Sequence, residues 1–188
     1  MATYLKYKKI LQSKRLSLFV RMRFFNAYIA SIFLYNSELW SVNKKIEKLI
    51  DVFHRNLLRK INKINYPYVI KNNTLYKRTK ENALSEVIKI RRLRWTGHLL
   101  RLPENAPAKL VLNEINQTYK INKKTCRKTW KKIVNEDLKT IDITYSIDGV
   151  KIKELAEDRE QWHRKVVIRP LQCPHRTERS HSSSRLVV

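Results

Sequence analysis

Four side chains that can carry positive charge follow one another at helical spacing near the middle of the sequence. They are Arg91, Arg94, His98 and Arg101, at intervals of three, four and three residues. At about 100° per residue, these intervals place all four on one face of a helix. Cationic groups in a row repel one another unless anions lie opposite, and a nucleic-acid backbone supplies phosphates for that position. The row therefore predicts contact with nucleic-acid phosphates.

Two neighbouring residues extend this face. Arg92 adds positive charge beside the row, and Trp95 lies where it can pack into a core or support a stacked base. A solvated helix face next to a core tryptophan fits the same spacing. Periodicity alone does not choose between these two interpretations.

Two further basic groups complete the predicted nucleic-acid-binding residues. One group lies in the polar stretch 117–129, and the other lies on a helix expected at 43–62. They are Lys123, Lys124, Arg127 and Lys128 in the first group, and Arg55 and Arg59 in the second. Because phosphate contacts carry no base code, we expect binding without base specificity.

The overall charge points to the same class of partner. In 188 residues, 41 lysines and arginines oppose 16 aspartates and glutamates, which gives a formal net charge of +25. Such an excess destabilises an isolated compact chain by self-repulsion and attracts polyanions. RNA or DNA is the first partner class that this charge indicates, and an anionic membrane surface is the second.

Helices must position these residues. Only 2 glycines and 5 prolines occur, which disfavours turn-rich β architectures. Apolar residues recur at helical spacing and predict helices at 15–40, 43–62, 74–79, 83–102, 108–115, 130–141 and 150–167. The link between the first two is short, and Asn43 suits an N-cap of the second. We therefore expect an all-α fold, an irregular helical bundle built on an antiparallel helix hairpin.

The same pattern divides the chain into five regions. Residues 1–14 are expected to be a flexible leader, 15–65 the hairpin, 66–141 a basic helical region, 142–168 a closing helix and 169–188 a disordered tail. The tail prediction rests on its prolines, its serine run and its scattered basic residues.

Residues that would carry catalysis or bind metal are sparse. Two cysteines cannot form a disulfide framework, which favours an intracellular location, nuclear or cytoplasmic. The candidate zinc ligands are Cys126, Cys173, His175 and His181, which lack the spacing of a zinc knuckle. The most apolar run, residues 24–35, is too short at 12 residues to span a bilayer. We expect no catalytic residue, no metal site, no cofactor and no transmembrane segment.

The arginine-rich stretch also carries a family resemblance. Residues 91–101 read RRLRWTGHLLR, which resembles the R-R-x-R-W-x-G-H-x-x-R segment near the C-terminal end of non-LTR (LINE-type) retrotransposon reverse transcriptases. Residues 25–40 resemble the family's F-N-A-x-x-x-S-x-L-L-Y-G-S-E-T-W helix, with Asn36 in place of the usual glycine. Residues 53–61 resemble its F-x-R-x-x-L-R-x-I pattern, and residues 155–162 its E-x-A-x-D-R-x-x-W closing helix. The four blocks follow in family order.

The resemblance implies a part of the polymerase that lies downstream of its catalytic palm domain, namely the helical thumb and the region after the thumb. The family's catalytic turn contains paired aspartates, and no two adjacent aspartates occur in this chain. In the intact family, the thumb holds the template–primer duplex through its backbone. The resemblance thus implies a non-catalytic nucleic-acid-binding fragment, with residues 15–65 as the thumb-like hairpin and a palm domain as a possible partner.

Three other interpretations stay open. The chain can be part of an RNA-directed DNA polymerase whose palm lies on a separate or upstream polypeptide. It can also be a degenerate transposon relic without function, because the glycines and the proline of the family's basic turn are missing from residues 117–129. Finally, it can be a basic helical protein that binds a membrane surface or serves as a scaffold.

Overall fold

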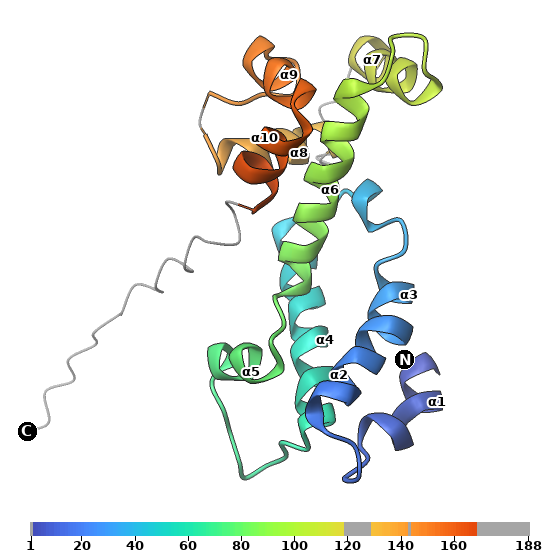
Figure 1. Ribbon diagram of the computed structural model, residues 1–188, viewed down its shortest axis with the longest axis vertical. Coiled ribbons are helices and arrows are strands. Elements are labelled where there is room, and N and C mark those ends of the chain that lie inside the picture. The colour runs from blue at the N-terminus through green and yellow to red at the C-terminus, as the bar shows by residue number, and fades with distance from the viewer. Residues whose placement is uncertain (1, 119–128, 143, 169–188) are drawn as a thin grey trace, which may run out of the picture.

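The computed structural model describes residues 2–118, 129–142 and 144–168. Every regular element in these ranges is a helix, which confirms the all-α fold class (Figure 1). The elements are α1 (Ala2–Leu11), α2 (Leu18–Phe25), the π-helix η1 (Asn26–Ala30), α3 (Ser31–Phe33), the 3₁₀-helix η2 (Ser37–Leu39), α4 (Lys44–Asn62), α5 (Asn72–Thr79), α6 (Leu84–Arg101), α7 (Pro107–Thr118), α8 (Trp130–Lys139), α9 (Val150–Glu157), α10 (Arg159–Trp162) and the π-helix η3 (His163–Ile168).

The chain reverses direction between the continuous helical stretch α2–η1–α3 and helix α4. Asn36 has a φ of 52°, a left-handed backbone that asparagine tolerates better than most residues. The side chain of Asn43 accepts a hydrogen bond from the Ile46 N–H at 3.0 Å and caps α4, as predicted. The rings of Phe33 and Phe53 stack with centroids 5.5 Å apart, so the two arms form the predicted hairpin.

The first residues do not form the flexible leader that we predicted. Helix α1 buries Tyr4 and Leu11, which are 3% and 0% exposed. The ring of Tyr7 meets Phe24 edge-on with centroids 5.1 Å apart. These α1 side chains follow one another at intervals of three and four residues, so they give this lysine-rich segment one apolar face that packs on the hairpin.

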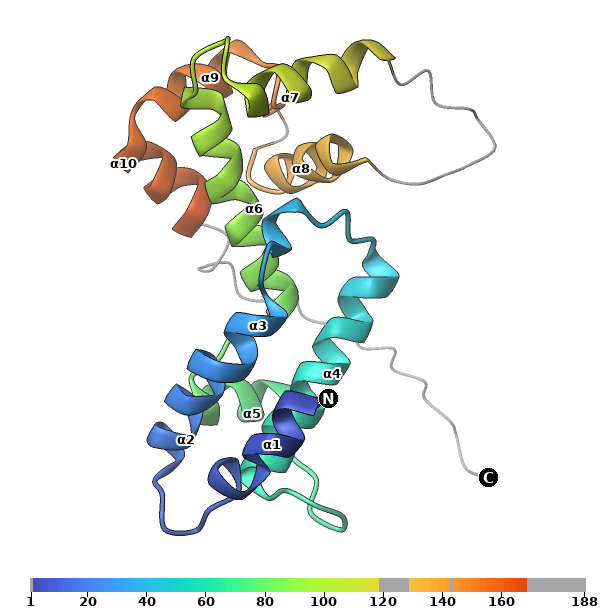
Figure 2. The same ribbon diagram turned by 90° about the vertical axis from the view of Figure 1, so that its right-hand side faces the viewer.

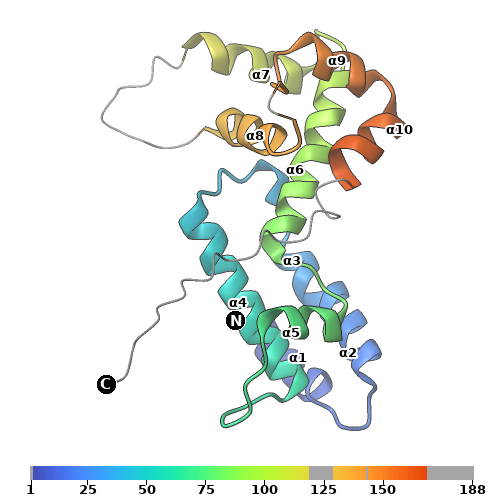
Figure 3. The same ribbon diagram turned by 90° about the vertical axis from the view of Figure 1, so that its left-hand side faces the viewer.

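Helix α6 runs through two hydrophobic cores. Its first half contributes Leu84 and Ile88 to a core shared with the hairpin and α1. Its second half contributes Leu93 to a core shared with α8, α9, α10 and η3. Figure 2 and Figure 3 show the hairpin gathered at one end of α6 and helices α7 to α10 at the other. Helix α6, which carries the cationic row, thus joins the two hydrophobic cores.

The predicted closing helix is broken in the middle. Asp158, with φ −84° and ψ 103°, leaves the helical conformation and separates α9 from α10. Its carboxylate accepts hydrogen bonds from the backbone N–H groups of Glu160 and Gln161, both at 2.9 Å. The break turns the chain, so that α10 and η3 pack back against α6 (Figure 1).

The remaining boundaries lie close to those predicted. Thr129 caps α8, because its side chain accepts a hydrogen bond from the Lys132 backbone N–H at 3.4 Å. Helix α5 begins at Asn72 rather than Thr74, without a side-chain cap. The predicted tail, 169–188, lies outside the described residues. Among the residues described, no helix combines the length and the apolar character that crossing a membrane requires.

Candidate nucleic-acid interface

The cationic row on α6 keeps three of its four members at the surface. Arg94, His98 and Arg101 are exposed, as their shared helix face predicts. Arg91 is half-buried, and its Nη1 donates a hydrogen bond to the Leu34 carbonyl oxygen at 2.8 Å. The row therefore has its exposed members toward the end of α6, whereas Arg91 is anchored against the hairpin.

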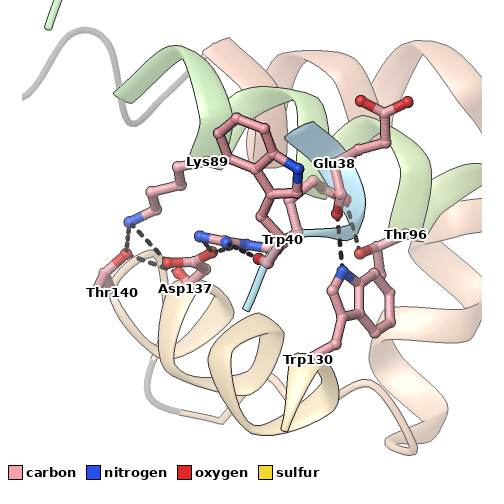
Figure 4. Close-up of polar contacts among 8 residues, drawn as sticks. Glu38, Trp40, Lys89, Thr96, Trp130, Asp137 and Thr140 are labelled. Carbon is pink, nitrogen blue, oxygen red and sulfur yellow. Dashed lines mark hydrogen bonds and ion pairs between the residues drawn. The ribbon is translucent and has the colours of Figure 1, made fainter. Parts of the chain in front are cut away.

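Arg92, which we predicted to bind nucleic acid, is 1% exposed and cannot reach a phosphate. Its Nε and Nη2 lie 2.8 and 2.7 Å from Oδ2 of Asp137. Its Nη1 donates to the Trp40 carbonyl oxygen at 3.1 Å. Figure 4 shows Lys89 and Thr140 beside the same carboxylate. Arg92 thus joins α6 to α8 and to the chain after η2, and the prediction for this residue is wrong.

A cleft of about 980 Å³ opens between α6 on one side and α10 with η3 on the other. Its lining combines four arginines, two histidines and a single carboxylate with two apolar side chains. The residues are Arg94, His98, Arg101, Arg159, Glu160, Trp162, His163, Arg164 and Val167. Positive groups from separate elements therefore face the same hollow.

The acidic groups near the cleft leave most of this charge uncompensated. Glu160 lies 3.3 Å from Arg164, but the two side chains are 85% and 72% exposed, and exposed pairs of this kind contribute little. Asp158 serves as the cap of α10, and the hydrogen bonds to its carboxylate, first from the Gln161 backbone, lower its pKa. Neither carboxylate neutralises Arg94 or Arg159, for which the structure gives no ion pair within the described residues.

A glycine sets the width of the cleft. A Cβ atom at Gly97 would lie 2.6 Å from Cε2 of Trp162, so only glycine allows α10 to approach α6 this closely. The Trp162 Nε1 donates to the Leu93 carbonyl oxygen at 3.2 Å and fixes the indole there. At the far end, Arg101 Nη1 donates to the Ala156 carbonyl oxygen at 2.9 Å. These contacts hold the two walls at a fixed separation.

Trp95 follows Arg94 in α6 and is half-buried. Its ring centroid is 5.2 Å from that of His98, with the rings tilted by 39°. Together with Glu38, Arg91 and Arg94, these two rings line a second hollow of about 460 Å³. Arg94 and His98 therefore belong to the walls of both the cleft and this hollow.

Two other predicted residues, Arg55 and Arg59, do not line this cleft. Both residues belong to α4. Figure 3 shows α4 and α5 together on the side of α6 away from α9 and α10. The Arg59 Nη2 donates to Oδ1 of Asn72 at 2.6 Å, which ties α4 to α5. Lys123, Lys124, Arg127 and Lys128 lie outside the described residues.

Three cleft residues were missed by sequence reasoning. Arg159, His163 and Arg164 belong to α10 and η3, which the sequence predicted only as part of a closing helix. Spacing along one helix cannot reveal them, because they face α6 only after Asp158 turns the chain. In the described part of the chain, no group of three or more His, Cys, Asp or Glu side chains is arranged to hold a metal ion.

Comparison of the chain with protein-family models, with curated protein sequences and with solved structures gave no match.

Proposed function

We propose that this protein binds nucleic acid through its phosphate backbone, in the cleft between α6, α10 and η3. The observation that carries the proposal is the convergence of Arg94, Arg101, Arg159 and Arg164 on one hollow with a single carboxylate in its lining. Arginine presents several donors in a planar fork that matches phosphate oxygens. Two histidines at the same cleft add imidazole N–H donors.

The binding is independent of base sequence. Within the described ranges, the polar groups of the cleft are guanidinium, imidazole, one carboxylate and the paired indole N–H of Trp162, and no asparagine or glutamine side chain lines it. Amide side chains are common readers of adenine edges, whereas phosphate contacts position a strand without reading it. Affinity should therefore depend strongly on salt and little on sequence.

The family resemblance extends this proposal to an origin. The chain corresponds to the thumb and downstream region of a non-LTR reverse transcriptase, without the palm. An apolar face on the hairpin supports such a fragment. Tyr28, Ile32 and Tyr35 follow at intervals of four and three residues and are 48%, 61% and 73% exposed. A palm domain packed on this face would cover them.

The test is the salt dependence of binding to a DNA duplex and to an RNA of equal length. The double variant Arg94→Ala/Arg159→Ala should lose affinity for both, and the slope of log K against log salt should fall by about one per arginine removed. Both residues are exposed, so the fold should persist. The measurement is fluorescence anisotropy between about 50 and 300 mM KCl, the range over which phosphate contacts weaken most visibly.

The matched control is Lys77→Ala/Arg78→Ala, which removes the same charge from exposed positions on α5, away from the cleft. Equal slopes for the two double variants would mean that net charge alone drives binding, and the cleft proposal would fail. Anionic vesicles provide the second comparison. Vesicles that bind the protein more tightly than either nucleic acid, and equally in both variants, would favour a membrane-surface role.

A further inference from the structure

An apolar groove lies beside the hollow that contains Arg94 and His98, and Trp95 lines both. It has a volume of about 420 Å³ and is bounded by side chains from η2, α6, α7 and α8, almost all of them hydrocarbon or aromatic. The lining residues are Leu39, Trp95, Leu99, Pro107, Ala108, Val111, Leu112 and Trp130. Val111 and Leu39 are 56% and 54% exposed, so the groove is open to solvent.

Two tryptophan side chains, Trp95 and Trp130, give this groove aromatic surfaces. The Trp130 Nε1 donates to the Glu38 carbonyl oxygen at 2.8 Å (Figure 4). The only polar atom of that indole is therefore satisfied, and its ring is held by the chain of η2. The ring of Trp95 lies beside that of His98 on α6. Aromatic faces in a groove with few polar groups suit a flat, apolar ligand.

The groove shares a lining residue with the hollow that contains Arg94 and His98. Trp95 lines both the groove and the hollow that contains Arg94 and His98. Arg94 and His98 in turn line both the hollow and the cleft. The arginine-rich cleft, the hollow lined by Arg94 and His98, and the groove with its two tryptophans are thus neighbours on α6.

A ligand that fits these neighbouring sites carries a planar aromatic group a short distance from an anion and continues as a polyanion. A single nucleic-acid strand has this chemistry, since each base is joined through a sugar to the phosphate chain. We propose that the groove takes one unpaired base of a single strand, stacked on Trp95, while the neighbouring phosphates lie on Arg94 and His98. This inference rests on the proposed function of the cleft and adds a preference for strands with unpaired bases.

The groove would accept any base. Stacking uses the π-face that all bases share, and an apolar lining offers no donors or acceptors to read base edges. A peptide segment would match the apolar groove but would leave the adjoining arginines without an anion.

The experiment compares two single-stranded oligonucleotides of equal length and charge. One carries thymine bases, and the other carries abasic tetrahydrofuran units throughout. We expect the intact protein to bind the base-bearing strand about fivefold or more tightly, which is the lower range for stacking of one base. Trp95→Leu should remove this preference, so that the base-bearing and the abasic strand bind with similar affinity.

Val111→Phe is the second variant, because its exposed position on α7 allows a ring to fill the groove without disturbing either core. Val111→Phe should also make the affinities for the base-bearing and the abasic strand similar. The control is Val69→Phe, the same change at a position 85% exposed between α4 and α5. This control should retain the wild-type preference, and circular dichroism would verify the fold of each variant.

The outcomes separate this inference from the function on which it rests. If the intact protein bound both strands equally and with strong salt dependence, the phosphate-binding cleft would stand and the base-binding groove would be wrong. If it bound neither strand, both proposals would fail. If dodecyl phosphate displaced the base-bearing strand better than thymidine monophosphate at equal concentration, the groove would be assigned to a lipid chain instead.

Discussion

At the scale of single residues, His54 is the most unusual side chain of the hairpin core. It is 0% exposed, and its ring stacks on Phe25 with centroids 5.8 Å apart. Neither ring nitrogen has a hydrogen-bond partner within the part of the chain that the structure describes. Burial lowers the pKa of His54 to about 4, with Asp51 opposing this shift and Arg55 adding to it.

We therefore expect stability to fall as the solution becomes more acidic. In the unfolded chain this histidine has a pKa near 6.5. Below that pH the unfolded chain therefore binds a proton more readily than the folded protein does. The stabilisation from a neutral His54 is complete above pH 6.5 and is lost progressively as pH falls toward 4. The total loss is about 3 kcal/mol from the size of the shift. Urea unfolding between these pH values measures it.

The control for this prediction is His54→Phe, which keeps an aromatic ring against Phe25 and cannot titrate. Its unfolding free energy should change much less over the same pH range, because the titratable groups that remain are the same in both proteins. Parallel pH curves for the two proteins would show that His54 is not the group responsible.

Arg92 and Arg94 show how differently two arginines of one motif can behave. They are two positions apart on α6, which places them on different faces of the helix. One is 1% exposed and paired with Asp137, and the other is exposed at the cleft. Removing one partner of a buried ion pair typically costs a few kcal/mol. Loss of binding in an Arg92 variant would therefore report unfolding as much as loss of contact.

At the scale of elements, the packing of α10 on α6 decides whether the cleft exists. Trp162 lies against Gly97 and contributes to the second core, and Val166 of η3 is 0% exposed in the same core. The walls of the cleft are thus supported by buried apolar side chains below its charged surface. Repulsion among the arginines is opposed by this packing.

Gly97→Ala should destabilise the second core. The added methyl group overlaps the Trp162 ring, and overpacking of this kind costs about 1 to 3 kcal/mol even though alanine favours helix. The unfolding midpoint in urea measures the loss. Trp162→Phe in the same background provides a smaller ring and should recover part of the stability. An alanine variant as stable as the wild type would mean that α10 does not approach α6 this closely.

At the scale of the whole molecule, positive charge is the dominant property. The chain has a net charge of +25, and the described ion pairs are few. Self-repulsion of this kind destabilises the compact state and is weakened by salt, which shortens the screening length from about 10 Å at 0.1 M to about 3 Å at 1 M.

We expect added NaCl to stabilise the fold while it weakens nucleic-acid binding. Between about 0.05 and 0.5 M NaCl, the unfolding temperature should rise by a few degrees, since repulsion is screened. Scanning calorimetry without nucleic acid measures this, and NaCl is preferable to phosphate buffer, whose anions can occupy the cleft. A falling unfolding temperature would mean that attractive pairs outweigh repulsion in this protein.

Sequence alone determined the features that depend on local chemistry. The all-α class follows from helical periodicity with few glycines and prolines, and the cap at Asn43 follows from a side chain that can accept a backbone N–H. The left-handed backbone at Asn36 and the exposure of Arg94 and His98 likewise depend on residue type and on helical spacing.

Only the tertiary structure decided which charges are free and which meet. Arg92 is withdrawn from solvent because Asp137, 45 positions away, lies opposite it. Arg159, His163 and Arg164 enter the cleft because the chain turns at Asp158 and because Gly97 admits Trp162. The groove of Trp95 and Trp130 forms from four elements. Periodicity describes one helix at a time, whereas burial and convergence depend on which residues distant in sequence pack against it.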